Sequence, residues 1–102
     1  MSPSGRRPRA PAGGRGERTL VVERVQTGVR MEKRILKVLK ALAELHDLSL
    51  GDLLEGIVLH AFEGKAPFDE ASRRRIADLK RIYGLDLDAS ASHRLREAAD
   101  GR

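Results

Sequence analysis

Apolar and polar positions alternate between residues 19 and 31, most cleanly over residues 25–31, where Val25 and Val29 share one side of the chain and Gln26 lies on the other. Period-two alternation with β-branched residues is typical of a half-buried strand. The pattern therefore predicts a strand over residues 19–31.

From residue 31 onward the apolar spacing changes to steps of four and three residues, which is typical of an amphipathic helix. This apolar stripe runs through Met31, Ile35, Val38, Leu42 and Leu45. It predicts a helix over residues 32–46. A second helix is predicted over residues 50–63, because Ser49 is a suitable N-cap and Gly64 a suitable glycine after the last turn. Its wide apolar face, with Gly56 in the middle, indicates burial against more than one neighbour.

The rest of the chain also favours helices. Asp69 is a suitable N-cap for a third helix over residues 70–83, which a glycine follows directly. A last short helix is predicted to start at Asp88 or Ser90 and to end near residue 99. The order of elements is therefore one strand followed by helices.

A single strand poses a hydrogen-bonding problem. Unpaired backbone donors and acceptors are avoided in native proteins, and nothing else in the chain resembles a partner strand. A two-fold axis can pair a strand with its own copy in antiparallel fashion. The sequence therefore predicts a homodimer with one two-stranded ribbon and four helices around a shared core.

The net charge of +5 over 102 residues is unevenly placed. Residues 1–18 are rich in Pro, Gly and Arg with little that is apolar, which predicts a disordered basic arm. Residues 24–40 hold six basic residues against Glu32, whereas residues 41–64 hold five acidic residues and no Lys or Arg. Basic arms and patches often bind polyanions, although a basic tail can also serve solubility alone.

Several function classes are disfavoured by composition. The chain has no cysteine, which excludes a disulfide scaffold, a thiolate zinc site and a cysteine nucleophile. The three histidines, His46, His60 and His93, lack metal-ligand spacing, and no phosphate-binding loop or nucleophile motif is present. We expect no enzyme activity, no cofactor and no metal. No apolar run approaches the roughly 18 residues of a membrane span, so a cytoplasmic protein is expected.

Residues 25–62 resemble the ribbon-helix-helix (MetJ/Arc-like) family of DNA-binding proteins. The resemblance rests on VQTGVRM, then EKRILKVLKALAELHDL, then SLGDLLEGIVLHAF, and it fits without gaps. It implies a mainly α fold: an obligate homodimer with a two-stranded antiparallel intersubunit β-ribbon, here with a helical C-terminal extension. It also implies that the ribbon enters the major groove of double-stranded DNA, which a two-stranded ribbon fits.

The resemblance assigns roles to individual residues. The implied base contacts are Gln26, Gly28 and Arg30. The implied phosphate contacts are Arg24, Lys33, Arg34, Lys37, Ser49, Leu50 and Gly51. The implied dimer core is Val25, Val29, Met31, Ile35, Leu54, Val58 and Phe62. The arm would add non-specific contacts through Arg6, Arg7, Arg9, Arg15 and Arg18.

Two features depart from that pattern. Gly28 stands where the family commonly has a polar side chain, and three interpretations stay open. In the first, only Gln26 and Arg30 contact bases. In the second, the absence of a side chain lets the ribbon enter the groove more deeply, and in the third this chain no longer selects a DNA sequence. At the start of the second helix, Asp52 and Glu55 would repel a phosphate. The plain alternative is a solvent-exposed strand face for Gln26 and Arg30. It is a solvent-exposed helix face for Lys33, Arg34 and Lys37, and an ordinary N-cap for Ser49.

The predicted organisation is an arm (1–18), a dimerisation and DNA-binding domain (19–64) and a helical extension (65–102). The leading hypothesis is a sequence-specific DNA-binding protein, a transcriptional regulator acting as a homodimer or as a higher oligomer on DNA. The alternative is an antitoxin or other protein-interaction module that binds a partner protein through residues 66–102. A basic membrane-surface protein is disfavoured, because no amphipathic segment is both basic and flanked by aromatic residues.

Overall fold

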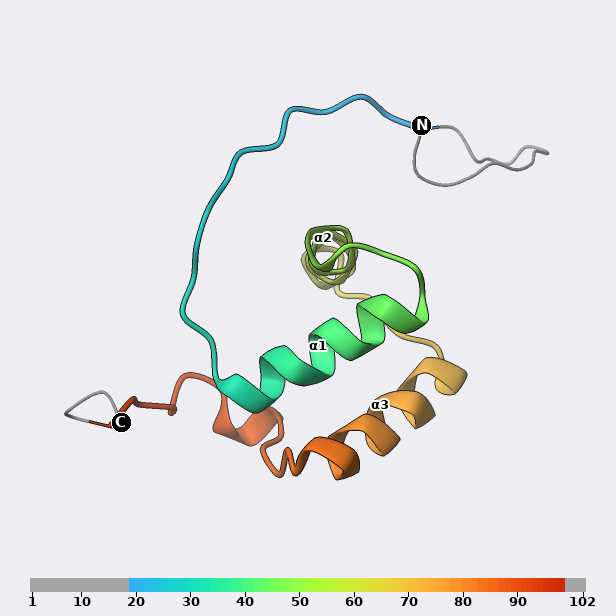
Figure 1. Cartoon of the computed structure of the whole chain (residues 1–102). Helices are drawn as coiled ribbons and strands as arrows, with labels where there is room; N and C mark the ends of the chain where they lie inside the picture. Colours follow the sequence, from blue (N-terminus) through green and yellow to red (C-terminus); the bar gives the residue numbers. More distant parts are fainter. Residues whose placement is uncertain (1–18, 99–102) are drawn as a thin grey trace.

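The computed structural model describes residues 19–98 and contains three α-helices. They are α1 (Lys33–Leu45), α2 (Leu50–Phe62) and α3 (Glu70–Tyr83), followed by a single 3-10 turn, η1 (Ala89–Ala91). Helices α1 and α3 lie side by side and run in opposite directions, while α2 crosses above α1 and is seen end-on (Figure 1).

Local capping sets the helix boundaries that the sequence predicts. Ser49 Oγ accepts a hydrogen bond from the Asp52 amide (3.1 Å), and this bond begins α2. Asp69 Oδ1 accepts one from the Ser72 amide (2.8 Å) at the start of α3. These contacts satisfy amides that have no partner within their own helix. The three predicted α-helices are confirmed to within one residue at each end.

Glycines in the left-handed region follow α2 and α3. Gly64 has φ 72° and Gly84 has φ 67°, values that a residue without Cβ adopts at the least cost. At Gly84 the chain leaves α3 through hydrogen bonds from its amide to Arg81 O and from Leu85 N to Lys80 O. The turn directs the following residues back toward α1.

The core lies where all three helices meet. Leu42, Ala43 and Leu53 are buried, and Leu42 is only 1% exposed. Five half-buried side chains surround them: Leu39, Ile57, Phe68, Ile76 and Leu79. Because Ile76 and Leu79 belong to α3, part of the apolar stripe of the third helix packs on this core, and α3 contacts α1 rather than α2.

The predicted strand is not present. In the part of the chain that the structure describes, no residue is in a strand, and no backbone hydrogen bond joins residues 19–31 to another residue. Figure 1 shows this stretch, the N-terminal segment (residues 19–31), as a long open curve leading into α1. Alternation of β-branched residues favours an extended backbone, but a strand also needs a hydrogen-bonding neighbour, and none of the described residues supplies one.

The fold prediction is therefore wrong. A ribbon-helix-helix fold requires an antiparallel β-ribbon, whereas residues 19–98 form an all-helical structure with three α-helices. The predicted last short α-helix is also wrong. Asp88 caps η1 by accepting a hydrogen bond from the Ser90 amide (3.0 Å), but the helical turn spans only Ala89–Ala91. Among the described residues, no helix combines the length and the apolar character needed to cross a membrane.

Candidate nucleic-acid interface

The candidate interface is built on the N-terminal segment and the first turns of α1. Gln26, Gly28 and Arg30, the predicted base contacts, are all solvent-exposed. A Cβ built on Gly28 meets no atom within 4 Å, so no packing requirement explains a glycine at this position. The three residues therefore lie on an open stretch of backbone that a large ligand can approach.

Arg30 is held by a carboxylate from the other end of the chain. Its Nε donates to Glu97 Oε1 (3.0 Å), and its Nη2 pairs with Glu97 Oε2, so the contact is bidentate. The hydrogen bond and charge of Arg30 lower the pKa of Glu97. Both side chains are largely exposed, at 82% and 62%, so solvent screens the pair.

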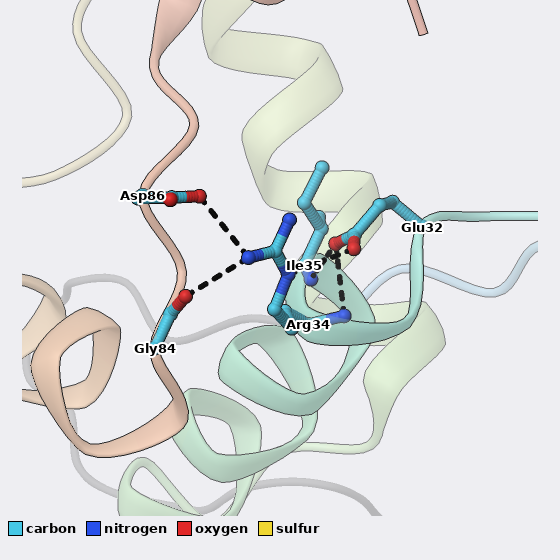
Figure 2. Close-up of polar contacts among 5 residues, drawn as sticks. All are labelled: Glu32, Arg34, Ile35, Gly84 and Asp86. Atoms are coloured by element: carbon cyan, nitrogen blue, oxygen red, sulfur yellow. Dashed lines mark hydrogen bonds and ion pairs between the residues drawn. The ribbon is translucent and has the colours of Figure 1, made fainter. Parts of the chain in front are cut away.

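Arg34 is the most closely held of the predicted phosphate contacts (Figure 2). Its Nε donates to Glu32 Oε2 (2.9 Å), and its Nη1 donates to Gly84 O and Asp86 Oδ1 (both 3.0 Å). Glu32 also caps α1, because Oε1 accepts hydrogen bonds from the amides of Arg34 (2.8 Å) and Ile35 (2.9 Å). These bonds, led by the Ile35 amide, lower the pKa of Glu32. Arg34 thus ties the start of α1 to the end of α3.

Arg24 is paired with α2. Its Nε and Nη2 donate to the two carboxylate oxygens of Glu55 at 2.8 and 2.6 Å, which lowers the pKa of Glu55. An apolar groove of about 620 Å³ lies beside this ion pair. The N-terminal segment lines it with Leu20 and Val22, and α2 lines it with Leu54, Val58 and Leu59. The segment is therefore joined to α2 by one bidentate pair, while Leu20 and Val22 face the open groove and stay 83% and 63% exposed.

Two lysines of the predicted phosphate contacts extend from α1 into solvent. Lys33 and Lys37 are both exposed, and Lys37 Nζ lies 5.8 Å from the centroid of the Tyr83 ring at the end of α3. That distance allows a cation–π interaction. Lys33, Arg34 and Lys37 lie in the first half of α1, and Arg30 lies three residues before the helix, so four cations are close together along the chain.

The predicted phosphate contacts at the start of α2 lie elsewhere. Ser49 and Gly51 are exposed and Leu50 is half-buried, so the amides of this first turn can be approached. Helix α1 has 13 residues and spans roughly 20 Å. Since α2 begins after the far end of α1, the structure does not place Ser49 beside Lys33.

The predicted dimer-core residues are mostly exposed in the single chain. Val25, Val29 and Phe62 are 78%, 76% and 80% exposed. Val58 and Met31 are also exposed, whereas Ile35 and Leu54 are half-buried. The remaining predicted contacts, Arg6, Arg7, Arg9, Arg15 and Arg18 of the arm, lie outside the described residues.

Three carboxylates of this site were not predicted to face its arginines. Glu55, Asp86 and Glu97 lie 31, 52 and 67 residues away from Arg24, Arg34 and Arg30. No periodicity links positions so far apart, and only the chain's path in three dimensions brings them together. The one partner that the sequence could have indicated is Glu32, because it directly precedes α1 and lies only two residues before Arg34.

Among residues 19–98, no three His, Cys, Asp or Glu side chains lie close enough together to hold a metal ion. The described site presents guanidinium, ammonium and amide groups, which are donors of the kind that can bind phosphates and base edges. Comparison with protein-family models, curated proteins and solved structures finds no match to this chain.

Proposed function

We propose that this protein is a sequence-specific, double-stranded-DNA-binding protein, a transcriptional regulator that acts as a homodimer at the nucleoid. The observation that carries the proposal is the exposed cationic stretch of residues 24–40, which carries six basic residues against Glu32. Five of the six are exposed to solvent along one continuous piece of chain: Arg24, Arg30, Lys33, Lys37 and Lys40. A duplex carries closely spaced phosphates that such a line of charge can neutralise.

Base selection is assigned to the N-terminal segment. Arginine donates two hydrogen bonds to guanine O6 and N7, and glutamine pairs in the same bidentate manner with adenine. Arg30 and Gln26 are exposed on an open backbone with Gly28 between them, and that glycine lets the chain approach base edges closely. This mode of binding needs no paired strand.

Phosphate binding is assigned to the first turns of α1. Lys33 and Lys37 are exposed there, and the arginines of residues 1–18 would add affinity that does not depend on sequence. Each phosphate neutralised releases counterions, so binding is expected to weaken steeply as salt is added. Asp52 in the first turn of α2 opposes a phosphate contact at that helix end.

The homodimer is proposed from α2 and its surroundings. Helix α2 is apolar on most of its surface, yet Leu59 and Phe62 are 63% and 80% exposed. A helix that is apolar all round is normally buried on more than one side. A second copy is the occupant we favour, because two copies related by a two-fold axis can cover the exposed apolar side chains of each other's α2 and leave the basic stretch 24–40 open to DNA.

The packing of α3 bears on the protein-partner alternative. Ile76 and Leu79, the first half of its apolar stripe, contact the core around Leu42, whereas Ile82 at the end of the helix is 70% exposed. A segment that waits for another protein would keep this stripe open. We therefore favour the DNA-binding function over an interaction module based on residues 66–102.

The test is in vitro selection of DNA sites by the full-length protein, followed by affinity measurements on the enriched site. We expect a two-fold symmetric motif, as a homodimer requires. Arg30→Ala should lose about ten-fold in affinity for that site and relax preference at one base pair of each half-site. Arg73→Ala is the matched control, since it removes one exposed positive charge from α3, outside the proposed contacts.

The proposal fails if no motif is enriched, or if Arg30→Ala and Arg73→Ala bind the selected site equally well. An enriched motif without two-fold symmetry would remove the homodimer while leaving sequence selection in place.

A further inference from the structure

We propose that the C-terminal segment (residues 85–98) is an acidic brake on DNA binding, in which Glu97 and Asp86 occupy arginines that DNA must engage. This inference rests on the proposed function and concerns the regulation of the same site. Two observations carry it: the bidentate pair of Glu97 with Arg30, and the contact of Asp86 with Arg34. Both carboxylates come from one stretch of chain that follows α3.

Competition follows from the atoms involved. Arg30 uses Nε and Nη2 to hold the two oxygens of Glu97. This edge is one of the two through which a guanidinium can hold a guanine edge or a phosphate by two parallel hydrogen bonds. A single guanidinium edge cannot hold Glu97 and a DNA group in this manner at once. DNA must therefore displace Glu97 to use this edge, and a phosphate at the remaining Nη1–Nη2 edge would still be repelled by the Glu97 carboxylate.

The path of the chain explains how Glu97 reaches Arg30. The left-handed turn at Gly84 ends α3 beside the start of α1, where Gly84 O accepts a hydrogen bond from Arg34. Asp86 then pairs with the same guanidinium group at 3.0 Å (Figure 2). Asp88 caps η1, and the Arg94 guanidinium donates to Ser90 O (3.0 Å), so two further contacts shape the segment before residue 97.

The two carboxylates differ in what they block. Arg34 is 35% exposed and is tied to the helix start by Glu32 as well as to Asp86, so it acts mainly as an anchor. Arg30 is 82% exposed and has Glu97 as the one partner that the described residues give it. Asp86 thus fixes the segment, and Glu97 is the group that competes with DNA.

The strength of the brake is limited by solvent. Exposed ion pairs are worth little, so the brake lowers affinity about two- to five-fold and does not abolish binding. It acts at every site that Arg30 contacts, and salt weakens it together with DNA binding. Its expected effect is graded control of affinity, largest at low ionic strength.

The experiment compares two glutamate variants of the full-length protein on a selected DNA site at low salt. Glu97→Gln removes the competing charge and keeps the size of the side chain. Glu63→Gln is the matched control, because Glu63 is similarly exposed and pairs with the neighbouring Lys65 (3.2 Å) rather than with the N-terminal segment. Both variants change the net charge equally, so a general gain in attraction to DNA affects both.

We expect Glu97→Gln to bind about two- to five-fold more tightly than Glu63→Gln. In an Arg30→Ala background this difference should disappear, since the two substitutions act on one contact. Equal affinities of the two glutamate variants overturn the brake, and so does a gain by Glu97→Gln that persists without Arg30.

A readout without DNA separates this proposal from the proposed function. Titration of the Glu97 carboxyl group by NMR should show a lowered pKa that rises toward its usual value in Arg30→Ala. A Glu97 pKa that does not respond to Arg30→Ala overturns the brake even if DNA binds. If the pKa responds but no variant binds DNA, the proposed function fails and the brake falls with it, while the contact between the two residues stands.

Discussion

The helical part of the chain (residues 33–83) and the N-terminal segment are stabilised in different ways. Each helix has a cap at its start, and all three contribute side chains to the core around Leu42. The N-terminal segment makes no backbone hydrogen bond to another described residue. Its arginines form direct, solvent-exposed ion pairs with Glu55 and Glu97. Local capping and burial therefore define the helices, whereas weak surface contacts hold the segment.

The largest effect expected from this comparison is on the core. Leu42→Ala removes a side chain that is 1% exposed and should lower the free energy of unfolding by about 2–5 kcal/mol. Leu20→Ala makes the same chemical change in the N-terminal segment, where Leu20 is 83% exposed, and should change it by less than about 0.5 kcal/mol. Denaturant unfolding followed by far-UV circular dichroism measures both. A comparable loss in the two variants would show that the segment is packed as firmly as the helices.

A smaller change in stability is expected when a glycine at a helix end or inside a helix is replaced by alanine. Gly84 has φ 67°, and Gly84→Ala should destabilise the protein by about 1–2 kcal/mol, because a Cβ is strained in the left-handed region. Gly56 lies inside α2, and Gly56→Ala should stabilise the protein by about 0.5–1 kcal/mol. A Cβ at either position meets no atom within 4 Å, so the opposite signs isolate backbone conformation from packing. Thermal unfolding gives both values, and the same sign in both variants would contradict the role of the left-handed turn.

The same contrast explains what sequence reasoning achieved. Helix starts at Ser49 and Asp69 and the turn at Gly84 were predictable, because each depends on residues within three or four positions. The strand prediction failed because alternation specifies an extended chain, while a strand depends on a second segment that lies outside the local pattern. Residues 19–31 thus have the extended backbone that a strand needs, but they lack the neighbouring segment that would pair with it, and tertiary contacts determine whether such a segment is present.

In the candidate site, too, features set by the local sequence pattern were predictable and features set by tertiary contacts were not. The exposed cations Lys33 and Lys37 could be placed from the helical period alone, since they lie opposite the apolar stripe of α1. The partners of Arg24 and Arg30 could not, because Glu55 and Glu97 reach them only through the turn between α1 and α2 and the turn after α3. Sequence patterns located the charges of this site but not the carboxylates that compete for them.

The smallest expected effect concerns acid stability and compares a cap with a surface pair. Hydrogen bonds from Ser72 lower the pKa of Asp69 below its usual 3.8, so its stabilising effect is complete above that pH and is lost as the pH falls through the lowered pKa. Asp69→Asn keeps a good N-cap but does not titrate, so unfolding free energy should fall less between about pH 5 and pH 2 than in the unmodified protein.

Glu97→Gln is the partner measurement for Asp69→Asn. The pKa of Glu97 is also lowered, by Arg30, and the sign of its pH dependence is the same. This pair is exposed to solvent, whereas Asp69 lies at the start of a packed helix. Glu97→Gln should therefore reduce the acid-induced loss of unfolding free energy less than Asp69→Asn does. Chemical denaturation at a series of pH values measures both slopes. A larger flattening from Glu97→Gln would mean that the contact between the C-terminal segment and Arg30 contributes more to folding than the cap of α3, which would reverse the ranking of the two regions.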